Sequence, residues 1–169
     1  DNSAAYFPTR VRAARDGEDG SNPMPGCDGV IELAPQGPLT AMGWEQSPKS
    51  HQLIIERSAR ESGLPIYITE NGSAWEDTVS DDGAVHDPER VNYLHEHLGA
   101  VADAIEGGTD VRGYFAWSLL DNFEWAYGYD KRFGIIHVDY DTQQRTIKDS
   151  GLEHAQILAN EHARTRGHR

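Results

Sequence analysis

The chain has 169 residues, enough for one domain with a hydrophobic core. Its formal net charge of -13 excludes binding to nucleic acid or an anionic membrane surface through clustered Lys and Arg. Cys27 is the only cysteine, which excludes an internal disulfide and favours a reducing, cytoplasmic location. No segment is apolar enough to span a bilayer. The chain starts at Asp1 without an initiator Met, which indicates a section or a processed product of a longer chain, or a chain that has been trimmed.

The first quarter of the chain has little regular pattern. Residues 4–11 could form a short strand, whereas residues 12–43, where Gly, Pro, Asp and Asn are frequent, are expected to form a long surface loop. Ser47-Pro48 then predicts the start of a helix, because Pro is favoured at the first helical position, and Gly63 predicts its end.

Two later segments have the composition of strands buried on both faces. Residues 65–69 form a run rich in β-branched and aromatic residues and lead directly into Glu70-Asn71-Gly72. Residues 111–117 are of the same kind and lead into an aromatic loop over residues 118–132. Each strand therefore delivers polar and aromatic side chains at its C-terminal end.

Three further elements complete the pattern. A helix is expected between Asp87-Pro88 and Gly107-Gly108, a hairpin over residues 133–146, and a closing helix over residues 152–164. The alternation of strand and helix is typical of a parallel α/β architecture. A (β/α)₈ barrel needs roughly 200 residues or more, so the chain can hold less than half of one.

Glu70 is a candidate catalytic carboxylate because of its position. It directly follows a strand, so its side chain is expected at the C-terminal rim, where barrel active sites lie. Residue type alone does not support this role, since a lone Glu after a strand is more often a solvated loop residue. Both interpretations remain open on this feature.

The end of the second strand and the aromatic loop after it contain a second candidate site, formed by Trp117, Glu124 and Trp125. Indole faces pack on the C–H faces of sugars, and a carboxylate accepts hydrogen bonds from neighbouring hydroxyls, so the three residues could form a sugar platform. The alternative is that Trp117 and Phe123 belong to the core and Glu124 is a surface acid.

Two long motifs in the same order resemble glycoside hydrolase family 1, of the β-glucosidase type. Residues 67–72 resemble its nucleophile signature, and residues 117–134 its glucose-binding loop. The resemblance is strong over residues 40–150 and includes Asp87-Pro88-Glu89-Arg90, Tyr93-Leu94, His97-Leu98, the run 133–140, Lys148 and Ser150. It implies the C-terminal part of a TIM barrel, about strands 6 to 8, across residues 1–169.

The resemblance also implies residue roles. Glu70 would attack the anomeric carbon of a terminal β-D-glucoside, and the glycone would be bound by Trp117, Glu124, Trp125 and Phe133. Tyr6 would hydrogen-bond the nucleophile from the sixth strand, although the family's Asn-Tyr-Tyr is here Ala4-Ala5-Tyr6.

The histidines give no sign of a metal site, and the family's chemistry needs neither a metal nor a cofactor. Four of them lack the spacing of metal ligands, namely His86, His95, His97 and His137. The other four are expected at the surface, namely His51, His154, His162 and His168.

The partner carboxylate of a retaining glycosidase is missing. Such an enzyme needs an acid/base residue roughly 5 to 5.5 Å from its nucleophile. The family's Thr-(Phe/Leu)-Asn-Glu-Pro motif does not occur, and neither do its N-terminal sugar-binding motifs with Gln and His. Asn160-Glu161-His162 is rejected because it lies in the expected closing helix and has His in place of Pro.

Three hypotheses follow. The first is a β-glucosidase section, inactive or impaired alone, that acts on β-linked glucosides or oligosaccharides once a complementary N-terminal barrel section or self-association completes it. The second is a non-catalytic carbohydrate-binding or degenerate section, favoured by Ala4-Ala5. The third is a structural module that assembles through open barrel edges.

Overall fold

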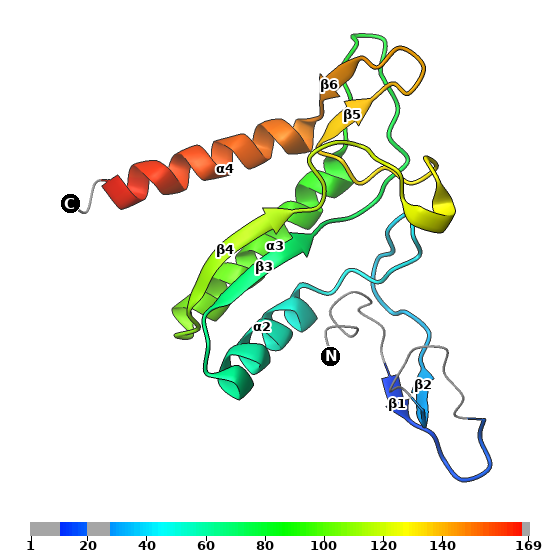
Figure 1. The fold of residues 1–169 in the computed structure, drawn as a ribbon, viewed down its shortest axis with the longest axis vertical. Helices are drawn as coiled ribbons and strands as arrows, with labels where there is room; N and C mark the ends of the chain where they lie inside the picture. The colour runs from blue at the N-terminus through cyan, green and yellow to red at the C-terminus, as the bar shows by residue number, and fades with distance from the viewer. Residues whose placement is uncertain (1–10, 20–27, 167–169) are drawn as a thin grey trace.

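The centre of the molecule is a pair of parallel strands, β3 (Ile66–Asn71) and β4 (Val111–Ala116), connected through helix α3 (Pro88–Glu106). The computed structural model describes residues 11–19 and 28–166. Helix α2 (Pro48–Ser62) precedes β3 and lies alongside it (Figure 1). The predicted parallel alternation of strand and helix is confirmed here.

Both helices begin and end where steric rules place them. Pro48 and Pro88 occupy first helical positions, and α2 ends at Gly63, whose φ of 67° is left-handed and therefore suits glycine. The residues before the two prolines, Ser47 and Asp87, do not cap the helices with their side chains. Instead, the Ser47 hydroxyl lies 2.6 Å from that of Ser50.

One face of the β3–β4 pair is covered and the other is open. Ile55 of α2 and Val101 and Ala104 of α3 pack with Ile68 to form a core on the covered face, joined by the partly buried Ile66, Val111 and Tyr114. On these strands Tyr67 and Phe115 are 58% and 60% exposed. The expectation that both strands are buried on both faces is therefore wrong for the described residues, because none of their elements covers the second face.

The segment expected as a loop over residues 12–43 contains a short ribbon. Strand β1 (Val11–Ala13) pairs antiparallel with β2 (Val30–Glu32). The strand predicted over residues 4–11 lies outside the described residues except for Val11, which belongs to β1, and Cys27 also lies outside them.

The predicted hairpin and closing helix are confirmed at the C-terminal end. Strand β5 (Ile136–Val138) pairs antiparallel with β6 (Arg145–Ile147), and helix α4 (Asp149–Arg166) follows, starting before the expected Leu152. Helix α4 projects from the rest of the molecule (Figure 1). Among the described residues, no helix is both long and apolar enough to cross a membrane.

A buried ion-pair network lies between the loops that follow β3 and β4. It consists of three acids and three bases: Asp77, Asp87, Asp121, Arg90, Arg132 and Lys148. Arg90 donates to both oxygens of Asp77, at 2.7 and 3.1 Å, and to Asp87. Lys148 Nζ bridges Asp77 at 2.5 Å and Asp121 at 2.8 Å. Opposite charges thus compensate one another where water is excluded.

The ion-pair network also binds backbone groups. Arg90 donates to the carbonyls of Ser73 and Arg132, at 3.2 and 2.9 Å, and so joins the loop after β3 to the loop after β4. Asp87 accepts hydrogen bonds from the backbone N–H and hydroxyl of Ser150, at 2.8 and 2.5 Å, which fixes the start of α4. The network therefore holds together the loops and helix starts around the end of β3.

Candidate active site

Glu70 lies in an irregular stretch at the end of β3. Ile68 pairs with Tyr114 and Asn71 with Ala116, so β3 advances from 68 to 71 while β4 advances only from 114 to 116. The extra residue forms a bulge containing Thr69 and Glu70. Bulges locally change the direction of side chains and are frequent beside active sites.

The glycine after Glu70-Asn71 brings the two candidate motifs together. The backbone N–H of Trp117 donates to the carbonyl of Asn71 at 2.8 Å, which continues the pairing beyond the strands. A Cβ on Gly72 would lie 1.6 Å from the carbonyl oxygen of Trp117, so no other residue fits without a backbone shift. This close approach places Trp117 directly beside the end of β3.

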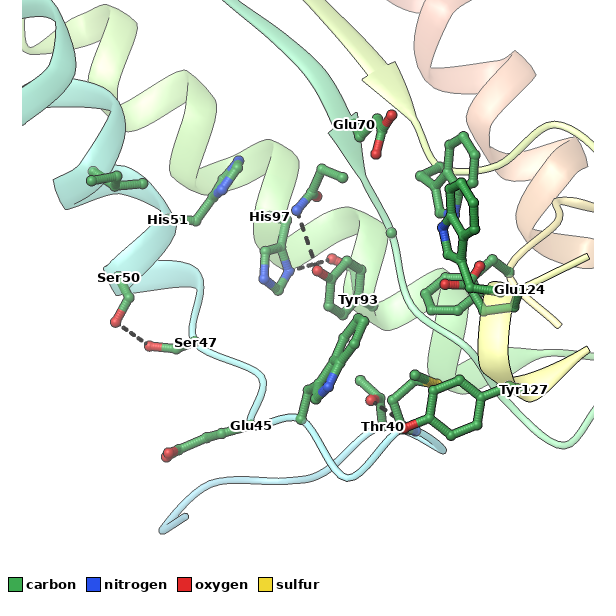
Figure 2. Close-up of a pocket in the computed structure, with 18 of the residues that line it drawn as sticks. Thr40, Glu45, Ser47, Ser50, His51, Glu70, Tyr93, His97, Glu124 and Tyr127 are labelled. Carbon is green, nitrogen blue, oxygen red and sulfur yellow. Dashed lines mark hydrogen bonds between the residues drawn. The ribbon is translucent and has the colours of Figure 1, made fainter. Parts of the chain in front are cut away.

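A cavity of about 570 Å³ lies at this end of the strands. It is lined by the five described residues that the sequence singled out: Glu70, Trp117, Glu124, Trp125 and Phe133. Figure 2 shows Glu70 on β3 and Glu124 on the loop after β4, with aromatic rings between them. Trp125 is 81% exposed and Phe133 only 3%. Tyr6 lies outside the described residues.

Sequence reasoning missed the wall formed by the segment before α2. Trp44 lines the same cavity, and its ring centroid lies 5.9 Å from that of Phe133. An indole next to a carboxylate, the signal used for Glu124 and Trp125, also occurs at Trp44-Glu45. Glu45 holds the preceding loop, because its Oε1 accepts a hydrogen bond from the backbone N–H of Gly37 at 2.8 Å.

Two of the carboxylates that line the cavity interact, Glu70 in the bulge of β3 and Glu124 on the loop after β4. Burial raises the pKa of Glu124, the charge of Glu70 raises it further, and a hydrogen bond from Trp117 opposes both effects. Glu161 lies exposed in α4 and does not line the cavity, consistent with the rejection of the Asn160-Glu161 pair as a catalytic motif.

The deep wall of the cavity contains two histidines and a tyrosine. The ring of His97 stacks on Tyr93 with a centroid distance of 3.7 Å, and its Nδ1 lies 2.9 Å from the Tyr93 carbonyl oxygen. His51 lies 5.6 Å from His97, between ring centroids. Burial is the main cause that lowers the pKa of each histidine to about 4.

The surface position predicted for four histidines is correct only in part. His51 is wrong, because its Nε2 is buried, and His154 is half-buried. His162 is exposed, and His168 lies outside the described residues. Within the described ranges no group of three or more metal-ligating side chains comes together.

His51 and His97 predict a stability that decreases below neutral pH. In the unfolded chain a histidine titrates near pH 6.5, whereas both have a pKa of about 4 when folded. Between these values the unfolded state binds more protons than the folded state. The contribution of the two histidines to the free energy of unfolding is therefore complete above about pH 6.5 and is lost progressively toward pH 4. Urea unfolding at pH 7 and pH 5 should differ by on the order of 2 kcal/mol.

The double variant His51→Gln/His97→Gln should lose most of this pH dependence. His86 is the matched control, because it is exposed and its pKa is raised by Asp149 and then by Asp82, so its small stabilisation is lost with rising pH instead. His86→Gln should therefore keep the decrease toward pH 5. An unchanged slope in the double variant would assign the decrease to other groups.

Comparison with known proteins places the chain in a family. The model of glycosyl hydrolase family 1 matches residues 4–163. Beta-glucosidase A of Thermotoga maritima is 52% identical over 124 residues, which are 73% of this chain and 28% of the relative. The bifunctional beta-D-glucosidase/beta-D-fucosidase of Bifidobacterium breve is 48% identical over 145 residues, 83% of this chain and 32% of the relative.

Solved structures agree with the sequence comparison. A family 1 β-glucosidase from Thermotoga maritima superposes with a TM-score of 0.81 at 44% identity, over 90% of this chain and 32% of that one. A structure of the β-glucosidase from the same organism with castanospermine gives 0.77 at 48% identity, over 80% and 31%. These neighbours are TIM barrels, and the chain spans about a third of their length. Glu70 and the residues that share its cavity thus lie in a chain that belongs to glycosyl hydrolase family 1.

Proposed function

We propose that the chain is the part of a retaining β-glucosidase that carries the catalytic nucleophile and the pocket for the terminal glucosyl unit. The observation that carries this proposal is the shared cavity. It brings Glu70, in its bulge at the end of β3, together with Glu124 and the indoles of Trp117 and Trp125 on the loop after β4. In this proposal the chain corresponds to about strands 6 to 8 of the barrel.

Glu70 attacks the anomeric carbon and forms a glycosyl-enzyme, from which water later releases the sugar with its configuration retained. Glu124 accepts hydrogen bonds from neighbouring sugar hydroxyls, while Trp117 and Trp125 pack on the C–H face of the ring. Phe133 forms a buried part of the wall of the pocket.

The acid/base carboxylate comes from outside this chain. It must lie roughly 5 to 5.5 Å from the Glu70 carboxylate, where it protonates the leaving oxygen and then activates water. The relatives extend well beyond this chain, which covers only 28% to 32% of their length. A complementary barrel section covers the exposed Tyr67 and Phe115 and completes the site, whereas a second copy of the chain covers them without adding an acid/base motif.

A carbohydrate-binding role without turnover is the second candidate. It is favoured by the intact sugar-facing wall of Trp117 and Trp125 in a chain that itself offers no acid/base motif. A structural module assembling through the open strands is the third, supported by the uncovered face of β3 and β4. Trapping of the covalent intermediate separates the first candidate from both others.

The experiment uses a 2-deoxy-2-fluoro-β-glucoside with a dinitrophenyl leaving group, which departs without acid catalysis. The chain is incubated alone and after co-expression with the N-terminal section of the Thermotoga maritima β-glucosidase A, and its intact mass is measured. We expect one sugar adduct, mapped by peptide analysis to Glu70, at least in the co-expressed sample.

Two variants control the assignment. Glu70→Gln should take up no adduct, and Glu161→Gln, which changes an exposed acid in α4, should be labelled like the wild type. Folded protein without an adduct in either sample contradicts catalysis. If the sugar still binds in that case, the carbohydrate-binding role is supported; if nothing binds, the structural role is.

A further inference from the structure

The side chain of Asn71, the residue after Glu70, is held at both ends by tyrosines. Its Nδ2 donates to the hydroxyl of Tyr93 in α3 at 3.3 Å, and the hydroxyl of Tyr114 in β4 donates to its Oδ1 at 2.9 Å. The amide therefore has a partner on its donor side and another on its acceptor side. We call Asn71, Tyr93 and Tyr114 the asparagine clamp.

The clamp is anchored in a part of the molecule that is largely closed to water. Burial raises the pKa of Tyr93 to about 12 and raises that of Tyr114 as well, so both hydroxyls stay protonated across the working range of pH. Tyr93 is stacked on His97, whose imidazole also lies 2.9 Å from the Tyr93 carbonyl oxygen (Figure 2). The ring of Tyr93 is thus held by His97, and the partly buried ring of Tyr114 packs against the core.

The clamp encloses the bulge that carries Glu70. Before the bulge, the backbone of Tyr114 is paired with Ile68, and after it the hydroxyl of the same tyrosine binds Asn71. One residue of β4 therefore holds β3 on both sides of Thr69 and Glu70. A residue in a bulge does not take part in the regular hydrogen bonding between the strands. The direction of its side chain therefore depends on the residues that fix the bulge at its two ends.

We propose that Tyr93 and Tyr114 are positioning residues for Glu70 and act through the side chain of Asn71. The proposal rests on the proposed function of Glu70 as nucleophile. A displacement of about 1 Å at a reacting group can lower a rate by about 100-fold, so loss of either hydroxyl affects the attack on the sugar more than the binding of the sugar.

The first measurement is the labelling of Glu70 by the fluoroglucoside in the chain co-expressed with the N-terminal section. Tyr114→Phe should lower the limiting rate of labelling about 10- to 100-fold and change the half-saturating concentration less than about 2-fold. Tyr93→Phe should act in the same direction but less, because its hydrogen bond is longer. The labelling control is Glu161→Gln in α4, which should label normally, and Tyr67→Phe, whose side chain is exposed in the chain alone, is the control for the spectra of the chain alone.

The second measurement needs no catalysis and uses NMR spectra of the chain alone. In Tyr114→Phe and Tyr93→Phe, the side-chain amide of Asn71 and the backbone amide and carboxyl carbon of Glu70 should all shift, whereas in Tyr67→Phe they should stay in place. A shift at Asn71 with Glu70 unmoved overturns the proposal, as does normal labelling of both clamp variants. If the wild type cannot be labelled, the proposed function fails, and the spectra alone decide whether the clamp positions Glu70.

Discussion

Replacing Glu70 by Gly should lower kcat for a natural β-glucoside by about 10⁴-fold or more in the chain co-expressed with an N-terminal barrel section. The reason is that the covalent route is lost when no carboxylate faces the anomeric carbon. Azide should restore part of the turnover of a dinitrophenyl glucoside, because it fits the space that the carboxylate vacates. The product should be α-glucosyl azide, since a single displacement inverts the anomeric centre. Chromatography against both azide anomers checks this result.

Glu124→Gln is the matched control, because it changes a second carboxylate that lines the same cavity. It should lower kcat/KM by about 10²-fold through weaker hydrogen bonds to the sugar hydroxyls, and azide should not rescue it. If azide produces the β anomer with Glu70→Gly, Glu70 acts as the acid/base and not as the nucleophile. Rescue of Glu124→Gln by azide would indicate that Glu124 is the nucleophile and that Glu70 binds the sugar hydroxyls.

Replacing Arg90 by Met should lower the free energy of unfolding by about 3 to 5 kcal/mol. Arg90 is buried and compensates Asp77 and Asp87, so its loss leaves Asp77 with Lys148 alone and removes the base that pairs with Asp87. Two backbone carbonyls, of Ser73 and Arg132, lose a donor as well. Urea unfolding at pH 7, followed by circular dichroism, measures the difference.

Arg112→Met provides the comparison at the surface. Arg112 also pairs with an aspartate, Asp110, at 2.7 Å, but both side chains are 55% exposed, so the change should stay within about 0.5 kcal/mol. Lys148→Met tests the same network from its other buried base and should again be strongly destabilising. Equal effects of Arg90→Met and Arg112→Met would show that burial of the network does not stabilise the fold.

Local steric rules made much of the fold predictable. Pro48 and Pro88 can start a helix but hardly continue one, and Gly63 adopts a left-handed conformation without strain, so these helix boundaries follow from single residues. The meeting of Glu70 with the loop after residue 117 was also predictable. Parallel strands deliver the residues that follow them to the same edge, wherever those strands lie in the sequence.

The ion-pair network was not predictable in the same way. Lys148 and Asp77 are separated by 71 residues, and no local period links two charged residues across such a distance. Asp87 in front of Pro88 has the pattern of a helix cap, but its carboxylate binds Ser150 and Arg90 instead. The ribbon of β1 and β2 could not be predicted for another reason. Strands of three residues are too short to show the alternation with a period of two that identifies a strand in a sequence.

The ion-pair network also has a consequence for recombination between related genes. All of its charged side chains lie between residues 77 and 148, and the residues around the cavity lie between 40 and 133. A crossover between residues 18 and 40 would therefore keep the whole network and the lining of the cavity in one segment from one parent. A crossover between residues 90 and 121 would instead take Asp77 from one parent and Lys148, which binds it at 2.5 Å, from the other, so we expect folded offspring from parents that share these two charges.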